Sequence, residues 1–300
     1  MNEDEITSEH TCARIGQLLG EIETLRLEMG RNKDARVPMQ VRDASPREVF
    51  YHAQTVHRKA NQLCVELGGS SVSPPSAAVP GRARPADVLK VLDGVRERLA
   101  QARSLLRIEG DTNKPDLPGP LVRDTGKTAT DVLSGCLLAS RQLNVMLAQA
   151  FASREGHEQL VRAVAICERL LALHDVDLPP APAFERRKSP RDVFQVLWQT
   201  GEALYQVLRD SNVSALQLDR GFVGEQPTDV YDIASLLVSE LDYLASFVPE
   251  QGGRSSMTTA PPPHVLPAHN FRRARQLQAA VEKLATAVKA KPGWLGDKKA

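Results

Sequence analysis

Apolar residues recur every three or four positions through most of this chain, which is the spacing of one face of an α-helix. Between residues 85 and 108, for example, Val88, Leu92, Val95 and Leu99 fall on one stripe. Seven other segments show the same spacing. We therefore predict an all-α protein with eight amphipathic helices, over residues 7–29, 46–68, 85–108, 128–151, 155–174, 190–209, 227–248 and 270–290.

Five of these helices begin with nearly the same residue types. One starts Ser-Pro-Arg-Glu at Ser45, and another starts Ser-Pro-Arg-Asp at Ser189. The serine hydroxyl can accept from a free amide of the first turn, and proline at the next position loses no helical hydrogen bond. A carboxylate three residues after the cap can accept from the amide of the cap residue. We predict capped helix starts whose carboxylates are Glu48, Asp87, Asp131, Asp192 and Asp229.

The helix starts are spaced alike in the two halves of the chain. Val49 and Val193, which follow the two serine–proline starts, are 144 residues apart, and Val88 and Val230 are 142 apart. A common order of residue types at a nearly constant offset favours tandem duplication. We predict two duplicated four-helix units, over residues 1–151 and 152–290, followed by a flexible basic tail at 291–300.

The predicted connections are long and rich in proline, over residues 68–84, 109–127, 175–189 and 249–269. Helices in bundles are usually joined by two to eight residues. About fifteen extended residues can run the whole length of a helix. Because Val or Leu stands beside many of these prolines, we predict that the connections lie along the bundle with their apolar residues docked.

Composition narrows the possible partners and compartment. The chain has 300 residues, 42% of them apolar, and a formal net charge of +1. A nearly neutral chain has no strong field for nucleic acid, and no run of 18 apolar residues predicts a membrane span. The acidic start at Met1 is unlike a secretory signal and predicts a cytoplasmic protein. If a signal peptide has been removed, the alternative is a periplasmic or secreted protein.

The four cysteines leave two interpretations open. Cys12, Cys64, Cys136 and Cys167 have no Cys-x-x-Cys spacing, so they do not predict a zinc site. All four lie on or beside apolar stripes, which predicts buried, inert thiols. If consecutive helices form antiparallel hairpins, Cys12 comes level with Cys64, and Cys136 with Cys167. Two disulfides would then be possible, and they would imply an oxidising compartment.

No pattern in the sequence predicts catalysis. Neither His-Glu-x-x-His nor Gly-x-Ser-x-Gly occurs. The run Gly126-Lys127-Thr128 resembles the end of a phosphate-binding loop, but Leu121 stands where that motif needs glycine, so Thr128 is better explained as a helix cap. We therefore predict no catalytic residue, no metal and no cofactor, and a protein that is not an enzyme.

Aromatic residues concentrate in one predicted helix, over 190–209. Phe194, Trp198 and Tyr205 follow one another there and predict core packing, or a partner-binding surface if Trp198 is exposed. The duplicated helical array and the long connections, together with the absence of catalytic motifs, predict a helical scaffold or adaptor that binds a protein partner. The alternative is a bundle that carries an apolar small molecule or cofactor, with Gly201 and Ala234 providing room.

Overall fold

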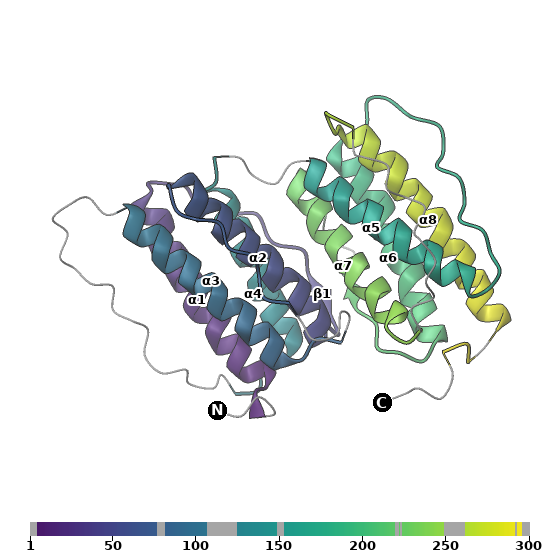
Figure 1. Ribbon diagram of the computed structural model, residues 1–300, viewed down its shortest axis with the longest axis horizontal. Helices are drawn as coiled ribbons and strands as arrows, with labels where there is room; N and C mark the ends of the chain where they lie inside the picture. Colours follow the sequence, from purple (N-terminus) through teal and green to yellow (C-terminus); the bar gives the residue numbers. More distant parts are fainter. Residues whose placement is uncertain are drawn as a thin grey trace. The chain divides into compact units, whose positions relative to one another are not determined.

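The computed structural model describes residues 5–76, 82–106, 125–148, 153–219, 222, 224–248, 262–291 and 293–295. Within these ranges the prediction of an all-α protein with eight helices is confirmed (Figure 1). The helices are α1 (Ser8–Glu28), α2 (Pro46–Glu66), α3 (Pro85–Leu106), α4 (Ala129–Asn144), α5 (Ser153–Ala172), α6 (Pro190–Asp210), α7 (Pro227–Ala245) and α8 (Pro267–Ala290). No helix of the described part is long and apolar enough to cross a membrane.

Each of the five predicted helix starts has the carboxylate contact that the sequence indicates, but only at Ser189 does the cap hydroxyl also accept from a first-turn amide. The carboxylates of Glu48, Asp87, Asp131, Asp192 and Asp229 accept from the backbone amides of their cap residues at 2.6–3.0 Å. A histidine takes the carboxylate's place in two further helices. Thr7 N donates to His10 Nδ1 at the start of α1, and Leu266 N donates to His269 Nδ1 at the start of α8. The predicted start of the last helix at residue 270 is therefore wrong by three residues.

The chain divides into two compact units. The first contains α1–α4, and the second contains α5–α8 together with the segment Gln40–Asp43 from the α1–α2 connection. In the first unit, α1 and α2 each pack against both α3 and α4. In the second, α5 and α6 each pack against both α7 and α8. The pairs α1/α2 and α3/α4 thus lie diagonally across the first bundle, and α5/α6 and α7/α8 lie diagonally across the second.

All four helices of the first unit point in the same direction. Between α1 and α3, residue numbers rise together in three ion pairs, which are Arg14–Asp93, Glu21–Arg96 and Glu28–Arg103. At the starts of α1 and α4, Gly126 N donates to Glu9 Oε1. At the ends of α2 and α4, Ala148 N donates to Glu66 Oε2. The unit is therefore an all-parallel four-helix bundle.

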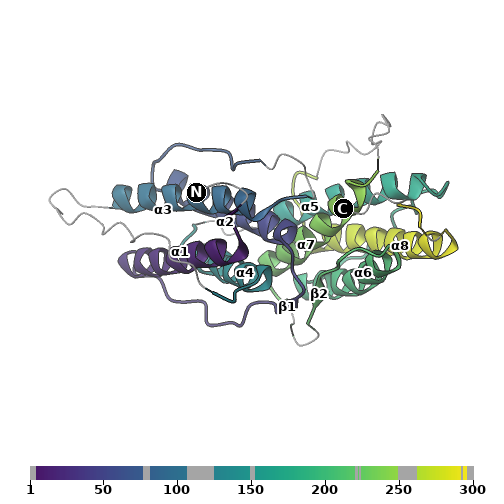
Figure 2. The ribbon, with the colours of Figure 1, turned by 90° about the horizontal axis from the view of Figure 1, so that it is seen from below.

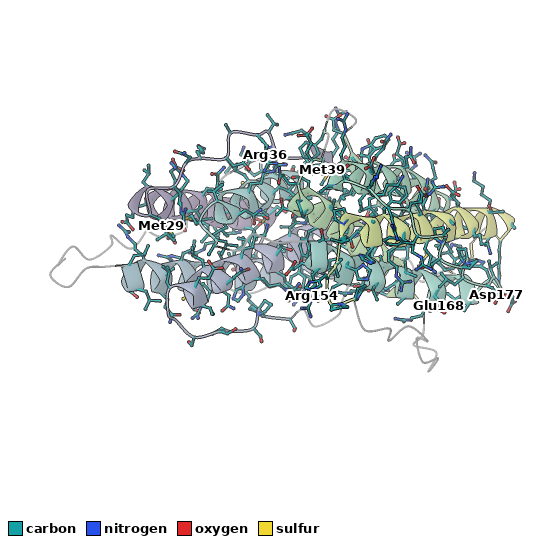
Figure 3. The ribbon with its side chains drawn as sticks, turned by 90° about the horizontal axis from the view of Figure 1, so that it is seen from above. Met29, Arg36, Met39, Arg154, Glu168 and Asp177 are labelled. Carbon is teal, nitrogen blue, oxygen red and sulfur yellow. The ribbon has the colours of Figure 1, made fainter. Side chains whose placement is uncertain are left out.

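The second unit is also an all-parallel bundle. At its starting end, Asn270 of α8 donates to the carbonyl of Ser153 in α5 at 2.8 Å. At the other end, the Trp294 ring lies 4.9 Å from the His174 ring, and its indole N–H donates to Ser211 Oγ at 2.9 Å. Arg154, Glu168 and Asp177, labelled in Figure 3, follow α5 from its start to beyond its end.

Parallel helices explain the long connections, because each connection must return the chain to the starting end of the bundle. The α5–α6 connection runs back along α8 (Figure 1). Its contacts have opposed numbering: Lys283 with Asp177 O, Gln276 with Pro179 O, and Arg272 with Pro182 O. The α1–α2 connection runs back along α4, through Asp34 with Gln142 and Ala44 with Thr130. Residues 107–124 and 249–261 lie outside the described part of the chain.

A short two-stranded sheet is the only strand structure in the described ranges. β1 (Val41–Arg42) pairs antiparallel with β2 (Gln217–Leu218), which lies between α6 and α7 in the chain (Figure 2). Val41 is opposite Leu218, and Arg42 is opposite Gln217. Leu218 also packs on α6, where the Cβ of any residue larger than glycine at position 201 would lie 2.7 Å from Leu218 Cδ1.

Residues with a left-handed backbone recur 144 residues apart, which is also the separation of the two serine–proline helix starts. Asp43 and Arg187, each two residues before a serine cap, have φ near +57° and +58°. Gly68 and Asn212, which follow the ends of α2 and α6, also have positive φ. Both pairs are 144 residues apart, so backbone conformation agrees with the sequence pattern. Tandem duplication itself stays a prediction.

Candidate binding surface

A groove of about 210 Å³ lies between α6 and β2 in the second unit. Its lining combines polar and apolar side chains: Gly201, Glu202, Tyr205, Gln206, Leu216, Gln217 and Leu218. Residues one turn apart on α6 form one wall of the groove, and the segment that contains β2 forms the other. This groove is open to solvent along one side and could receive one or two side chains of another molecule.

Tyr205 is the fixed aromatic group of this groove. Its hydroxyl accepts from Gln217 Nε2 at 2.9 Å and from Arg209 Nη1 at 3.1 Å. The Arg209 guanidinium carbon lies 5.8 Å from the centre of the same ring. Because both neighbours hold the ring, Tyr205 offers a preorganised face whose conformational entropy is already reduced.

The other two residues of the predicted aromatic surface lie elsewhere. Phe194 is 3% exposed and packs edge-on against Phe222, with ring centres 5.4 Å apart. Trp198 is half-buried, so the exposure that a binding role at this position required is not observed. The structure therefore brings only Tyr205 to the groove. The spacing of the aromatic residues on one helix could not show which of them are buried. The segment around β2, which covers part of α6, comes from another part of the chain.

Leucine side chains lie beside Gly201, one of the two small residues named for the ligand-carrier alternative. Gly201 faces Leu218, and Leu237 lies 3.5 Å from the position of a Cβ there. Ala234 is fully buried in the same bundle. The ligand-carrier alternative stays a prediction.

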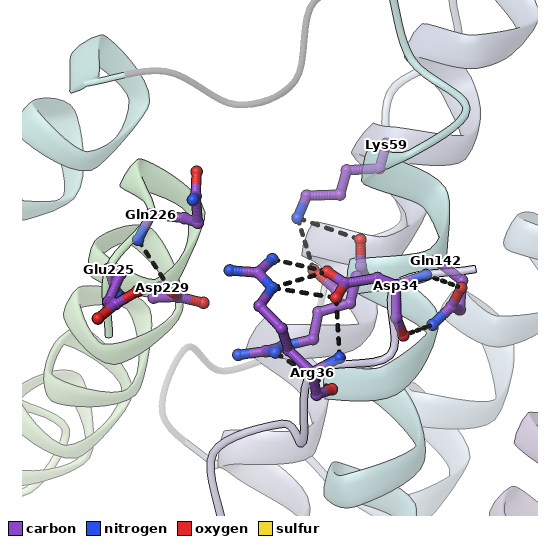
Figure 4. A network of polar contacts seen from close by, with 9 residues as sticks. Asp34, Arg36, Lys59, Gln142, Glu225, Gln226 and Asp229 are labelled. Carbon is purple, nitrogen blue, oxygen red and sulfur yellow. Dashed lines mark hydrogen bonds and ion pairs between the residues drawn. The ribbon is translucent and has the colours of Figure 1, made fainter. Parts of the chain in front are cut away.

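A buried polar network ties the α1–α2 connection to the first bundle (Figure 4). Lys59 is fully buried, and its ammonium donates to Ser140 Oγ at 2.6 Å. Gln142 exchanges two hydrogen bonds with the backbone of Asp34, at 3.0 and 3.3 Å. The Arg36 guanidinium binds the Asp34 carboxylate and holds the pKa of that carboxyl below its usual range. These contacts fix the α1–α2 connection against the first bundle.

Two histidines, His57 and His157, are buried within the helical units. His57 is 2% exposed, and burial, assisted by Arg98 and Arg58, lowers its pKa to about 4. Burial also lowers the pKa of His157, whose Nδ1 lies 3.1 Å from Asn270 Oδ1. No group of three or more His, Cys, Asp or Glu residues in the described ranges is arranged to hold a metal ion.

All four cysteines are free thiols, so neither predicted disulfide is present. The antiparallel premise behind them was wrong: α1 and α2 are parallel, so Cys12 near the start of α1 and Cys64 near the end of α2 lie at opposite ends of the bundle. Burial raises the pKa of Cys64, and it raises those of Cys136 and Cys167 to about 12. Cys12 adds to the shift at Cys136, because α1 and α4 are neighbours.

Part of the predicted flexible tail contacts the second bundle, and the flexibility of the tail stays a prediction. Trp294 packs against the ends of α5 and α6 through His174 and Ser211. An aromatic ring with a hydrogen-bonded N–H gains enough contact to hold this turn in place. Position 292 and residues 296–300 lie outside the described part of the chain.

A second exposed surface, which the sequence reasoning missed, lies where α6 and α8 begin. Phe184 is 43% exposed, and its ring lies 5.0 Å from the ring of His269. The Lys188 ammonium lies 4.1 Å from the centre of the Phe271 ring. The run Arg186-Arg187-Lys188 beside an aromatic residue was the available signal. Its place next to the start of α8 could not be read from the sequence.

Comparison with known proteins adds no identification. No family model, no curated protein and no solved structure matches this chain.

Proposed function

We propose that this protein is a non-catalytic helical scaffold that binds a protein partner through its second unit. The observation that carries the proposal is the groove between α6 and β2, with Tyr205 held at its wall. Sites that enclose a drug-sized ligand measure about 300–1,000 Å³ and are mostly apolar. A groove of about 210 Å³ with a mixed lining suits the side chains of a docked protein segment better.

The positions of the reactive side chains also support a binding role. A thiol acts as a nucleophile only as thiolate, and the pKa of about 12 at Cys136 and Cys167 keeps both protonated at neutral pH. The Lys59 ammonium is committed to Ser140. None of these residues lines the groove. The reactive groups thus serve packing, whereas the solvent-facing groove offers an aromatic face and amide groups.

Capture of a partner by groove variants tests this function. Gln206 is exposed on the groove wall, so Gln206→Trp should fill the groove without disturbing the core. Gln195→Trp, on an exposed position of α6 outside the groove lining, is the matched control. We expect a protein recovered from the native source by wild type and by Gln195→Trp to be lost with Gln206→Trp. Equal recovery by all three, or a small molecule that co-purifies in native mass spectrometry, would contradict the proposal.

A further inference from the structure

The segment Pro182–Ser189, which precedes α6, offers an open backbone edge. Phe184, Glu185, Arg186 and Arg187 are all exposed. Their amides and carbonyls make no hydrogen bond with the part of the chain that the structure describes. Unpaired N–H and C=O groups along an extended segment are a template for an added strand.

The corresponding segment of the α1–α2 connection carries a strand partner. At the offset of 144 residues, Pro38 matches Pro182, Ser45 matches Ser189, and the left-handed residue Asp43 matches Arg187. At that offset, β1 corresponds to residues 185–186. β1 is paired antiparallel with β2, whereas residues 185–186 are not paired. A segment that ends in the same left-handed residue therefore accepts a strand in the α1–α2 connection, whereas residues 185–186 have no strand partner within the described ranges.

Positive charge surrounds the open edge. Arg186, Arg187 and Arg191 are exposed and form no ion pair within the described chain. Arg272 lies beside them, because its Nε donates to Pro182 O at 2.8 Å. The adjacent start of α8 has no acidic residue in its first turn, so the positive end of its dipole is not offset there. Glu185 is the acidic residue of this segment, and its carboxylate forms an ion pair with the Lys188 ammonium at 2.7 Å.

A second copy of this chain is a poor occupant of the edge. The segment that matches β2 at the same offset is residues 73–74, and it continues into Pro75. In the β1–β2 pair, Asp219 N donates to Gln40 O at 3.0 Å, and Pro75 stands at the position that matches Asp219. Proline has no N–H to donate, and Pro74 lacks one as well. β2 itself is already paired with β1.

We propose that residues 183–186 bind an extended acidic segment of a partner protein by strand addition, with Phe184 packing against an apolar residue of that segment. This inference rests on the proposed scaffold function and names the chemistry of the partner. The acidic side chains complement the arginines, and the backbone edge supplies hydrogen bonds. With a net charge of +1, the whole chain favours a short acidic peptide over a long polyanion.

Binding of a labelled peptide to the full-length protein tests the charge requirement. The probe is a fluorescein-labelled decapeptide of alternating glutamate and valine, and its affinity is measured by fluorescence anisotropy. We expect the double substitution Arg186→Glu/Arg187→Glu to weaken binding by more than about tenfold. The matched control is Arg169→Glu/Lys289→Glu, which reverses two exposed cations near the ends of α5 and α8. Equal weakening by both pairs, or tighter binding of an oligothymidine, overturns the inference.

N-methylated probes test the strand geometry. Only alternate amides of an added strand point toward its partner. We therefore expect that methylating either the glutamate amides or the valine amides abolishes binding, whereas methylating the other set does not. In hydrogen exchange, the bound probe should slow alternate amides within residues 183–186. Retained binding by both methylated peptides shows a contact of charge alone and overturns strand addition.

The two proposals fail in distinguishable ways. A native partner that is lost with Gln206→Trp but captured equally by wild type and Arg186→Glu/Arg187→Glu would overturn this inference and leave the scaffold function standing. A different outcome is that no partner is captured while the glutamate–valine probe still shows the predicted charge and methylation effects. The backbone edge would then be a peptide-binding site, and the proposed binding of a partner in the groove would be contradicted.

Discussion

At the scale of single residues, close contacts decide where the chain accepts change. Gly224 lies against the ring of Phe194, and a Cβ at this position would overlap the ring. Phe194 is buried in the core of the second unit, so the ring cannot move outward without opening a cavity. The need for glycine here comes from space, because Gly224 is not among the residues with positive φ.

We expect Gly224→Ala to lower the free energy of unfolding by about 1–3 kcal/mol, the usual cost of overpacking a core. Gly20→Ala is the control, because Gly20 is exposed within α1 and nothing lies within 4 Å of its Cβ position. Alanine there should stabilise the protein by up to about 1 kcal/mol through helix propensity. Urea unfolding of both variants measures the difference. Equal stabilities would contradict the packing described around Phe194.

His57 should make stability depend on pH. Its pKa is about 4 in the folded protein and about 6.5 when unperturbed, so the unfolded chain binds the proton first as pH falls. The stability contributed by neutral His57 is therefore complete above pH 6.5 and is lost as pH falls toward 4. The loss amounts to about 3 kcal/mol.

We expect His57→Phe, which keeps a ring beside Gly94, to remove that part of the pH dependence. Because burial also lowers the pKa of His157 and of His174, both proteins should retain some acid sensitivity. Chemical unfolding at pH 7 and at pH 4.5 compares them. Parallel losses of stability in the two proteins would show that His57 is not the responsible group.

At the scale of elements, helix starts are where local sequence dictates structure most directly. A capping box needs only a cap residue and an acceptor three positions later, so five starts could be predicted from residue types alone. The start of α8 was missed, because His269 performs the carboxylate's task and the Leu266 side chain cannot accept a hydrogen bond. A proline at residue 267 was the available signal.

We expect Ser189→Ala to destabilise the second unit by about 1 kcal/mol. Ser189 Oγ accepts from the amide of Asp192 at 3.3 Å and donates to its carboxylate at 2.7 Å. Thr286→Ala, at an exposed position inside α8, is the control and should change stability by less than about 0.5 kcal/mol. Thermal unfolding of the variants measures both. An effect at Thr286 as large as that at Ser189 would contradict the capping role.

At the scale of the whole molecule, the direction of the helices determines what the connections must do. Parallel helices bring all helix starts of a unit to one end, so their dipoles add instead of cancelling. The acidic residues in the first turns offset this charge at most starts, but not at α8. The exposed arginines near α8 therefore lie in a field that already attracts anions.

The sequence could predict the length of the connections but not the direction of the helices. Apolar spacing is the same whichever way a helix runs, and hairpins are the usual arrangement of consecutive helices. The antiparallel premise then produced the wrong disulfides between Cys12 and Cys64 and between Cys136 and Cys167. Long proline-rich connections were the physical clue, since an antiparallel bundle has no need of them. The groove at Tyr205 depends on β2, which no helical pattern could place.

Helix direction is the central claim, and distances between spin labels test it most directly. In a Cys12→Ser background, one label replaces Glu28 at the end of α1, and the second replaces either Arg103 or Lys90 in α3. The ion pair between Glu28 and Arg103 predicts that the 28–103 distance is the shorter one. The 28–90 pair should be longer, because 13 residues of helix span about 20 Å. The reverse order would show antiparallel helices and contradict the account.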